Sequence, residues 1–222
     1  MIVVENKTEN ELKYLINENI SLVHLIDIFS RKGYRIQSIS EVHNNDNYYD
    51  TKDLNLYENQ CSLRIREKNA GNKTTYLGTY KSPYNNDDIY SSRKEIEKPL
   101  EGGSFEDLKS TLKDDIQNFE LVDQSPVLNS KTKRMDVILE KDTEQIALSY
   151  DQTEYTNYLI GGLKHTDLML EVEIIESLNC SKTLNDINSF LTAYLTDLEL
   201  NKQSKYERGI LKTNSKEKNI SL

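Results

Sequence analysis

The sequence lacks the residues on which several kinds of functional site depend. It has no tryptophan, only two cysteines and only three histidines among its 222 residues. Cys61 and Cys180 lie far apart without metal-ligand spacing, so we expect buried free thiols and a reducing, cytoplasmic compartment. The histidines are scattered singly, which gives little support to a histidine-based zinc site or a histidine-centred catalytic triad.

Long apolar runs and an excess of positive charge are also missing. No stretch approaches the roughly 20 apolar residues of a membrane span, and the run at residues 1–4 is too short for a signal peptide. Acidic residues outnumber basic residues by 37 to 28, which gives a formal net charge of -9. Since nucleic-acid binding normally needs a basic surface, we do not expect a nucleic acid as a partner. Because no apolar run is long enough, we do not expect a membrane either.

The sequence does contain strands in which charged and apolar residues alternate. Near the N-terminus, Glu9, Glu11 and Lys13 would share one face of a strand, with Leu12 and Tyr14 on the other face. Similar alternation returns in residues 62–66, 89–97, 127–140, 145–151 and 168–174. One such strand usually has a solvated polar face, but a fold of this size must bury one face of several strands. We therefore predict a closed sheet whose charged faces are pooled inside.

Three segments show the helical spacing of apolar residues that would cover the outer face of this sheet. They span residues 20–32, 104–114 and 183–198, and the second opens with a capping pattern at Ser104 and Asp107. About eight strands together with these helices predict an α+β fold, namely a closed antiparallel eight-stranded β-barrel with helices packed outside.

No internal repeat and no domain boundary is visible along the chain. At 222 residues, a single domain is the default expectation. We assign this domain to residues 1–212 and a polar C-terminal tail, rich in Lys, Asn and Ser, to residues 213–222.

The pooled face would combine carboxylates with cationic side chains. Its acids are Glu9, Glu11, Glu95, Glu97, Asp151, Glu171 and Glu173, and its bases are Lys13, Arg64, Arg66, Lys81, Arg93 and Arg134. Arginine and lysine together favour a polyanion, because arginine binds phosphate oxygens through two parallel hydrogen bonds. Clustered carboxylates favour a hard divalent cation, Mg²⁺ or Mn²⁺. The face thus predicts a metal-dependent site for a chain of phosphates, while Arg93, Glu97 and Asp151 would also suit structural ion pairs.

This ordered set of motifs resembles the CYTH superfamily, whose members are also called triphosphate tunnel metalloenzymes. The resemblance covers roughly residues 5–210. It rests on Glu9-x-Glu11-x-Lys13, Arg64-x-Arg66, Lys81, Glu95-x-Glu97, Arg134, Asp151, Glu171-x-Glu173 and Lys205. The resemblance implies an eight-stranded tunnel, divalent-metal chemistry on a small triphosphate substrate and, since members are often dimers, it allows a homodimer.

The resemblance also implies a role for each matching residue. The metal ligands would be Glu9, Glu11 and Glu173, with Glu171 beside them and Asp151 near them. The phosphate oxygens would be held by Lys13, Arg64, Arg66, Lys81, Arg134 and Lys205, together with Arg93 of the pooled face. Glu95 and Glu97 would form a second metal site or balance charge, and catalysis would rest on Glu11, Glu173 and Lys13.

The activity that these residues favour is hydrolysis of the terminal phosphoanhydride of inorganic tripolyphosphate, with nucleoside triphosphates as further substrates. Each recognisable side chain addresses phosphate or metal, and none addresses a nucleobase. Three alternatives stay open. They are a class IV adenylyl cyclase, a thiamine triphosphatase, which the absence of tryptophan weakens, and a non-catalytic polyphosphate-binding module, which would gain nothing from the carboxylates.

Overall fold

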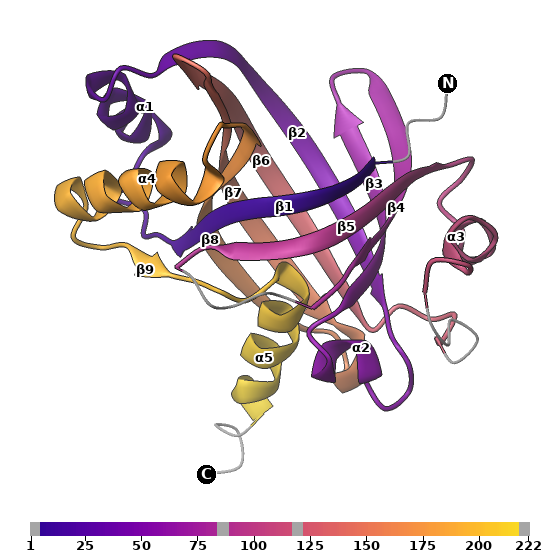
Figure 1. Cartoon of the computed structure of the whole chain (residues 1–222). Helices are drawn as coiled ribbons and strands as arrows, with labels where there is room; N and C mark the ends of the chain where they lie inside the picture. The colour runs from indigo at the N-terminus through magenta and orange to yellow at the C-terminus, as the bar shows by residue number, and fades with distance from the viewer. Residues whose placement is uncertain (1–4, 84–88, 117–121, 218–222) are drawn as a thin grey trace.

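One antiparallel sheet curves round and closes on itself. The computed structural model of the chain describes residues 5–83, 89–116 and 122–217. Its strands are β1 Glu5–Leu15, β2 Arg35–Tyr49, β3 Ser62–Ala70, β4 Lys73–Lys81, β5 Ser91–Leu100, β6 Leu128–Lys141, β7 Glu144–Asn157, β8 Leu163–Glu176 and β9 Glu199–Leu200. The sheet runs in the order β5-β4-β3-β2-β6-β7-β8-β1, and pairing of β1 with β5 closes it (Figure 1). The predicted eight-stranded barrel is confirmed, with β9 as a short addition to β1.

Charged and apolar residues alternate along the barrel strands, and the charged face points inward. In β1, Glu9, Glu11 and Lys13 line an internal cavity. Leu12 and Tyr14 lie on the outer face of the same strand, in a hydrophobic cluster. The barrel therefore buries these apolar side chains between its wall and the helices. Its interior is a polar lumen, and closure of the sheet pairs the backbone groups of the barrel strands.

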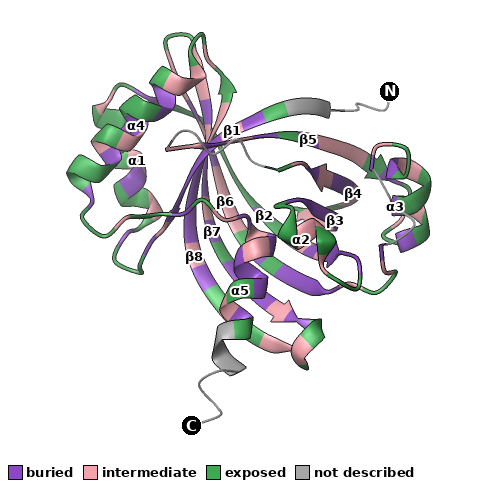
Figure 2. Ribbon diagram, turned by 60° about the horizontal axis from the view of Figure 1, so that its bottom comes forward, coloured by how far each residue is buried: buried purple, intermediate pink, exposed green. Residues whose placement is uncertain are grey.

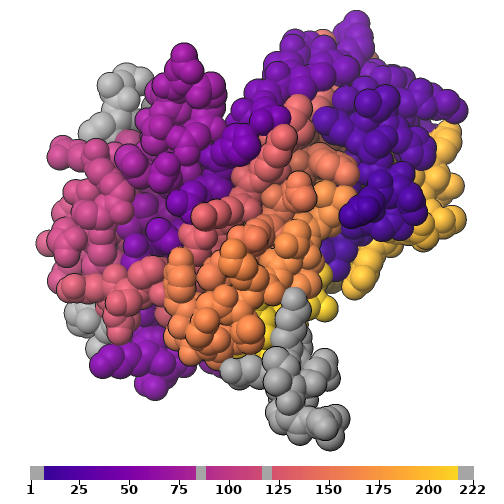
Figure 3. Space-filling view, turned by 180° about the vertical axis from the view of Figure 1, so that it is seen from behind, coloured from indigo at the N-terminus to yellow at the C-terminus, as the bar shows by residue number. Residues whose placement is uncertain are grey.

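Helices cover opposite flanks of the barrel. Within the described segments the α-helices are α1 Leu22–Arg31, α2 Asn55–Glu58, α3 Phe105–Leu112, α4 Cys180–Tyr194 and α5 Lys205–Glu217. Helices α1 and α4 share one flank and α3 lies on the other, with exposed residues on their outer sides (Figures 1 and 2). From behind, β6 to β8 form part of the surface (Figure 3). None of the described helices is long and apolar enough to cross a membrane.

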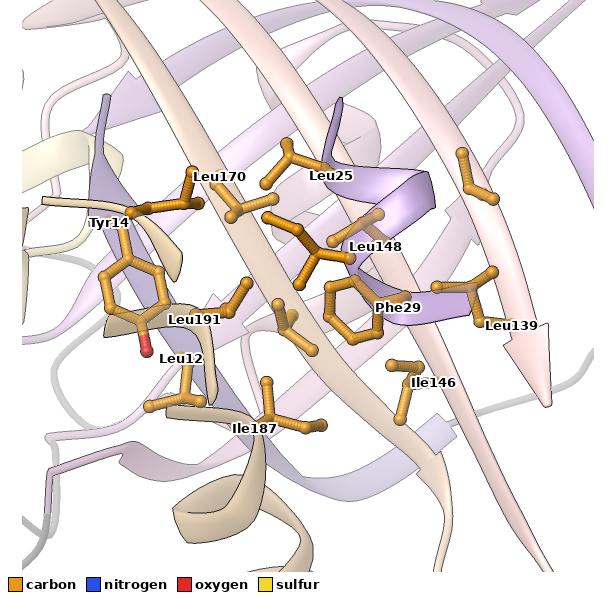
Figure 4. Packing of buried hydrophobic residues seen from close by; sticks show 14 of the residues in the cluster. Leu12, Tyr14, Leu25, Phe29, Leu139, Ile146, Leu148, Leu170, Ile187 and Leu191 are labelled. Atoms are coloured by element: carbon orange, nitrogen blue, oxygen red, sulfur yellow. The ribbon is translucent and has the colours of Figure 1, made fainter. Parts of the chain in front are cut away.

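The largest hydrophobic cluster joins α1 and α4 to the outer faces of β1, β6, β7 and β8 (Figure 4). Phe29 of α1 meets Phe190 of α4 edge-on, with ring centroids 5.1 Å apart. Leu12, Leu148 and Ile187 are completely buried beside them. Since burying a side chain of this size contributes about 1.5–3 kcal/mol, this cluster fixes the two helices on the barrel wall.

Two of the predicted helices have the expected positions, and the third begins earlier than predicted. Helix α3 starts at the capping box in which Asp107 N donates to Ser104 Oγ at 3.1 Å. Helix α4 begins at Cys180 instead of residue 183, because Asn179 Oδ1 accepts from Lys182 N at 3.0 Å and so caps the helix. It ends at Tyr194, four residues before the predicted end.

No sequence pattern predicted α5, which closes one end of the lumen. Tyr206 and Ile210 of α5 are buried against inward-facing residues at the barrel end, among them Leu128 and Tyr155. The helix runs on to Glu217, so the boundary drawn at residue 212 falls inside it. Thr213 is completely buried and accepts a hydrogen bond from Asn157 Nδ2 at 2.8 Å.

Candidate active site

The barrel encloses a polar cavity of about 220 Å³. The predicted site residues that line it are Glu9, Glu11, Lys13, Arg64, Arg66, Lys81, Arg93, Glu95, Glu97, Arg134, Glu171, Glu173 and Lys205. The remaining predicted residue, Asp151, lies completely buried behind Arg134. Side chains drawn from positions 9 to 205 of the chain therefore converge on one space, because the closed barrel turns each charged strand face inward.

Glu9 lies at the centre of the first group of charges. Lys81 Nζ is 2.8 Å from both carboxylate oxygens of Glu9, and Arg93 Nε is 3.0 Å from Oε2. Lys81 also approaches Glu95 at 3.4 Å. Burial alone would raise the pKa of Glu9, but Lys81 and Arg93 outweigh it and hold this pKa well below its ordinary value. Glu9 is therefore ionised, and it fixes two cations at the cavity wall.

Glu11 and Glu173 form the part of the cavity whose chemistry best suits a metal ion. They are direct partners across the β1–β8 pairing, so their carboxylates extend from neighbouring positions on the inner face. Lys13 Nζ lies 2.9 Å from Glu11 Oε1. Like charges opposite each other destabilise a sheet, and a hard divalent cation with oxygen ligands would remove this repulsion.

A third group joins β6, β7, β8 and α5. Arg134 binds Asp151 through Nε at 2.7 Å and Nη2 at 2.6 Å, and Nη2 is 2.5 Å from Glu171 Oε2. Lys205, the first residue of α5, lies 2.9 Å from Asp151 Oδ2 and also contacts Glu171. Burial opposes ionisation of Glu171, but Lys205 and Arg134 outweigh it and lower its pKa strongly. Both oxygens of Asp151 are thus engaged by cations.

Asp46 of β2 is a site residue that the sequence analysis missed. It is completely buried, and it binds Arg66 through two hydrogen bonds of 2.7 Å and Arg64 at 3.4 Å. Burial would raise the pKa of Asp46, but Arg66 and Arg64 lower it to about 2. The sequence pattern that could have revealed Asp46 is the polar series Asn44, Asp46 and Tyr48 at alternate positions. It repeats the alternation used to predict the charged face of β1.

Further residues line the cavity that no sequence motif singled out. They are Tyr48, Ser62, Lys68, Ser204 and Tyr206. Tyr206 stacks on Tyr48 with ring centroids 5.2 Å apart, and its hydroxyl donates to Asp50 at 2.7 Å. Both tyrosines are almost completely buried.

The charges around the cavity nearly cancel. Eight lysine and arginine side chains and six glutamates line it. Three further acids, Asp46, Asp136 and Asp151, contact the lining arginines from behind. The buried Nε of Arg64 has no hydrogen-bond partner among the described residues. An anion carrying several charges would therefore need extra positive charge to enter this cavity.

The described residues contain no group of three or more Asp, Glu, His or Cys side chains already converged on one metal position. The lumen carboxylates contact lysines and arginines instead. The residue types still fit a hard cation, because Glu11 and Glu173 offer adjacent oxygen ligands beside the cavity and the charge balance calls for added positive charge.

Comparison with known proteins identifies related chains. A family model described as the CYTH domain matches residues 7–209. No curated protein sequence matches the chain. The PH1819 protein of Pyrococcus horikoshii OT3 is 20% identical, with a TM-score of 0.61, over 92% of this chain and 99% of that one.

Two further solved structures carry functional names. A Hippeastrum protein, described as a putative adenylyl cyclase with a dominant triphosphatase activity, is 16% identical with a TM-score of 0.59, over 92% of this chain and 96% of its own. A putative adenylate cyclase of Bacillus halodurans is 17% identical with a TM-score of 0.54, over 91% and 97%. At such identities these similarities establish the fold alone.

Proposed function

We propose that this chain, which belongs to the CYTH domain family, is a metal-dependent triphosphatase that hydrolyses the terminal phosphoanhydride of inorganic tripolyphosphate. The observation that carries the proposal is the composition of the cavity wall. Eight cationic and six acidic side chains line about 220 Å³, and the remaining lining residues are two serines and two tyrosines. Such a wall offers hydrogen bonds and charge to phosphates, and its two tyrosines, Tyr48 and Tyr206, stack on each other.

Phosphate binding would fall to the cations that the acids already hold in place. Arg66 and Arg134 each use Nε and Nη2 to bind a buried aspartate, which leaves Nη1 of each guanidinium for a phosphate oxygen. Lys81 lies between Glu9 and Glu95 and supplies a point charge from another wall. Cations that are fixed before the substrate binds lose little side-chain entropy on binding, so they favour a defined phosphate orientation.

Hydrolysis would take place at the end of the phosphate chain that lies between these cations. The fixed positive charges would stabilise the charge that spreads over the phosphoryl oxygens when water attacks in line. Glu11 and Glu173 would hold a divalent cation, which when bound supplies the charge neutralisation that lets water approach a polyanion. Lys13, which contacts Glu11, would lie next to the reacting phosphate. Glu95 and Glu97 would balance the charge of Arg64 and Lys81.

The experiment that tests the proposal is a phosphate-release panel with the purified protein. Tripolyphosphate, ATP, thiamine triphosphate and pyrophosphate are compared with Mg²⁺, with Mn²⁺ and with a chelator. We expect the highest kcat/KM with tripolyphosphate and no release with the chelator. Equal or faster release from ATP would refute the substrate assignment. Formation of cyclic AMP from ATP would instead support the cyclase alternative, and tight binding without turnover would support a binding module.

A further inference from the structure

Asp46, like Asp151, is a completely buried acid that contacts a cavity-lining arginine without itself lining the cavity. Its carboxylate is completely buried on β2. Arg66 Nε donates to Oδ1 and Arg66 Nη2 donates to Oδ2, both at 2.7 Å. Arg64 Nη1 and the hydroxyl of Tyr48 approach Oδ2 at 3.4 and 3.5 Å. Asp46 thus lies one layer behind the residues that would touch a phosphate.

The same arrangement occurs twice in the barrel. Asp46 and Arg66 are direct partners in the β2–β3 register, as Arg134 and Asp151 are in the β6–β7 register. In both pairs the arginine binds the aspartate through Nε and Nη2. Two hydrogen bonds from the Nε and Nη2 edge fix the plane and direction of the guanidinium group. The Nη1 edge then points away from the aspartate. Strands β3 and β6 therefore each carry an arginine whose guanidinium group is oriented by a buried aspartate on the neighbouring strand.

The surroundings of Asp46 favour the charged form of its carboxylate, because two guanidinium groups contact it. Burial opposes its ionisation, but Arg66 and Arg64 lower its pKa to about 2. A neutral side chain at this position would leave the two arginines without their shared carboxylate. The long arginine side chains would then regain rotamer freedom.

We propose that Asp46 is a positioning residue that orients Arg66, and to a lesser degree Arg64, for phosphate binding. This inference rests on the proposed function of the cavity. Asp46 acts through the arginines and does not touch the substrate. Removing its charge increases the net positive charge of the lumen, so a purely electrostatic role predicts tighter binding of a triphosphate on removal, whereas a positioning role predicts weaker binding.

The decisive variants are Asp46→Asn and Asp46→Glu. Asn keeps the size and loses the charge, while Glu keeps the charge and displaces the guanidinium. We expect either change to raise KM for tripolyphosphate about tenfold, equivalent to roughly 1.4 kcal/mol, with kcat within about twofold. The matched control is Asp115→Asn, which removes an ion pair of similar length, 2.6 Å to Lys98, on the outside of the barrel and leaves KM unchanged.

A double-mutant cycle separates positioning from general stability. In an Arg66→Lys background the bidentate contact is already lost, so adding Asp46→Asn should change KM less than about threefold. Full additivity of the two substitutions would overturn the inference. Because breaking a buried ion pair is costly, melting curves accompany every variant, and Asp46→Glu serves as the test if Asp46→Asn does not fold.

A spectroscopic measurement decides the inference even if the proposed function fails. In nitrogen-15 NMR spectra, the Nε–H signal of Arg66, identified with Arg66→Lys, should exchange slowly with solvent in the wild type and be lost or broadened in Asp46→Asn. An unchanged signal, or a lost signal with unchanged KM in an active enzyme, would overturn the inference. A protein that neither binds nor hydrolyses any triphosphate, but shows the signal change, would refute the proposed function and leave Asp46 as the residue that orients Arg66.

Discussion

At the scale of single residues, seven of the eight described cations that line the lumen contact an acid before any substrate arrives. Lys81 is bound by Glu9, Arg66 by Asp46 and Arg134 by Asp151. These pairs solve two problems at once. They prevent the lysines and arginines from repelling one another in a confined space, and they limit the conformations of long side chains. The lumen is therefore organised by its own ion pairs, with phosphate binding as the proposed consequence.

The first prediction concerns Arg66→Ala. This variant should raise KM for tripolyphosphate about 10- to 100-fold, because a charge-assisted hydrogen bond contributes roughly 1.5–3 kcal/mol and each 1.4 kcal/mol is a factor of ten. Steady-state phosphate release measures the change. Arg35→Ala is the matched control, since Arg35 lies mostly exposed in a 3.5 Å ion pair with Glu140 outside the cavity. An unchanged KM in Arg66→Ala would contradict the phosphate-binding assignment.

The sequence predicted most of the cavity lining because alternating charges on strands imply a shared face. Arg64 and Arg66, or Glu171 and Glu173, carry that signal within three residues. It could not reveal which acid neutralises which base, since those contacts join strands far apart in the chain. Asp46 was not predicted for a second reason. Strand β2 begins with a run of exposed residues, so the alternation of buried and less buried side chains starts only at Val42.

At the scale of secondary structure elements, α5 determines where Lys205 lies. The helix packs so closely on the barrel that a Cβ at Gly209 would lie 2.5 Å from Leu128 Cδ2 and 2.8 Å from Tyr155 Cδ1. Arg208, next to it, is buried and donates from Nη2 to Asp167 at 2.8 Å. Glycine is therefore required at this position by close approach of the helix and not by its backbone angles.

The second prediction is that Gly209→Ala lowers both stability and activity. Overpacking typically costs about 1–3 kcal/mol, against a gain of roughly 1 kcal/mol in helix propensity. A helix that moves outward also withdraws Lys205 from Glu171 and Asp151. Thermal melting and phosphate release measure the two effects. Leu211→Ala, on the exposed side of the same helix, should change neither, and a fully stable, fully active Gly209→Ala would contradict this role of α5.

The elements that sequence patterns predicted are those whose apolar faces are regular. The strands with charge alternation and the helix capped by Ser104 belong to this group. Helix α5 gave no such signal, because its sequence from Lys205 to Glu217 is polar apart from a few positions and its burial comes from Tyr206 and Ile210. Tertiary packing at the barrel end, which no local pattern encodes, stabilises this helix.

At the scale of the whole molecule, the fold places its two larger hydrophobic clusters outside a charged interior, and a smaller cluster fills the barrel end that α5 closes. Burial would raise the pKa values of Glu9, Asp46 and Glu171, but neighbouring cations lower all three. A carboxylate whose pKa is lower in the folded than in the unfolded state stabilises the fold above its unfolded pKa, about 4, and this contribution is lost as the pH falls through the folded value.

The third prediction follows from the lowering of these carboxylate pKa values in the folded state. The melting temperature should be nearly constant from about pH 8 to pH 5 and should fall steeply below about pH 4, where the paired carboxylates take up protons in the unfolded chain. Scanning calorimetry across this range measures the profile. Loss of stability centred at pH 6 or above would contradict the account, since none of these carboxylates titrates there.

The central claim is that the lumen hydrolyses the end of a phosphate chain with the help of a cation held at Glu11 and Glu173. Phosphorus-31 NMR of tripolyphosphate, incubated with Mg²⁺ and either wild-type protein or Glu11→Gln, tests it most directly. The wild type should produce orthophosphate and pyrophosphate in equal amounts, and folded Glu11→Gln should be slower by a factor on the order of 10² or more. Wild-type rates in Glu11→Gln, or intact tripolyphosphate with the wild type, would contradict the claim.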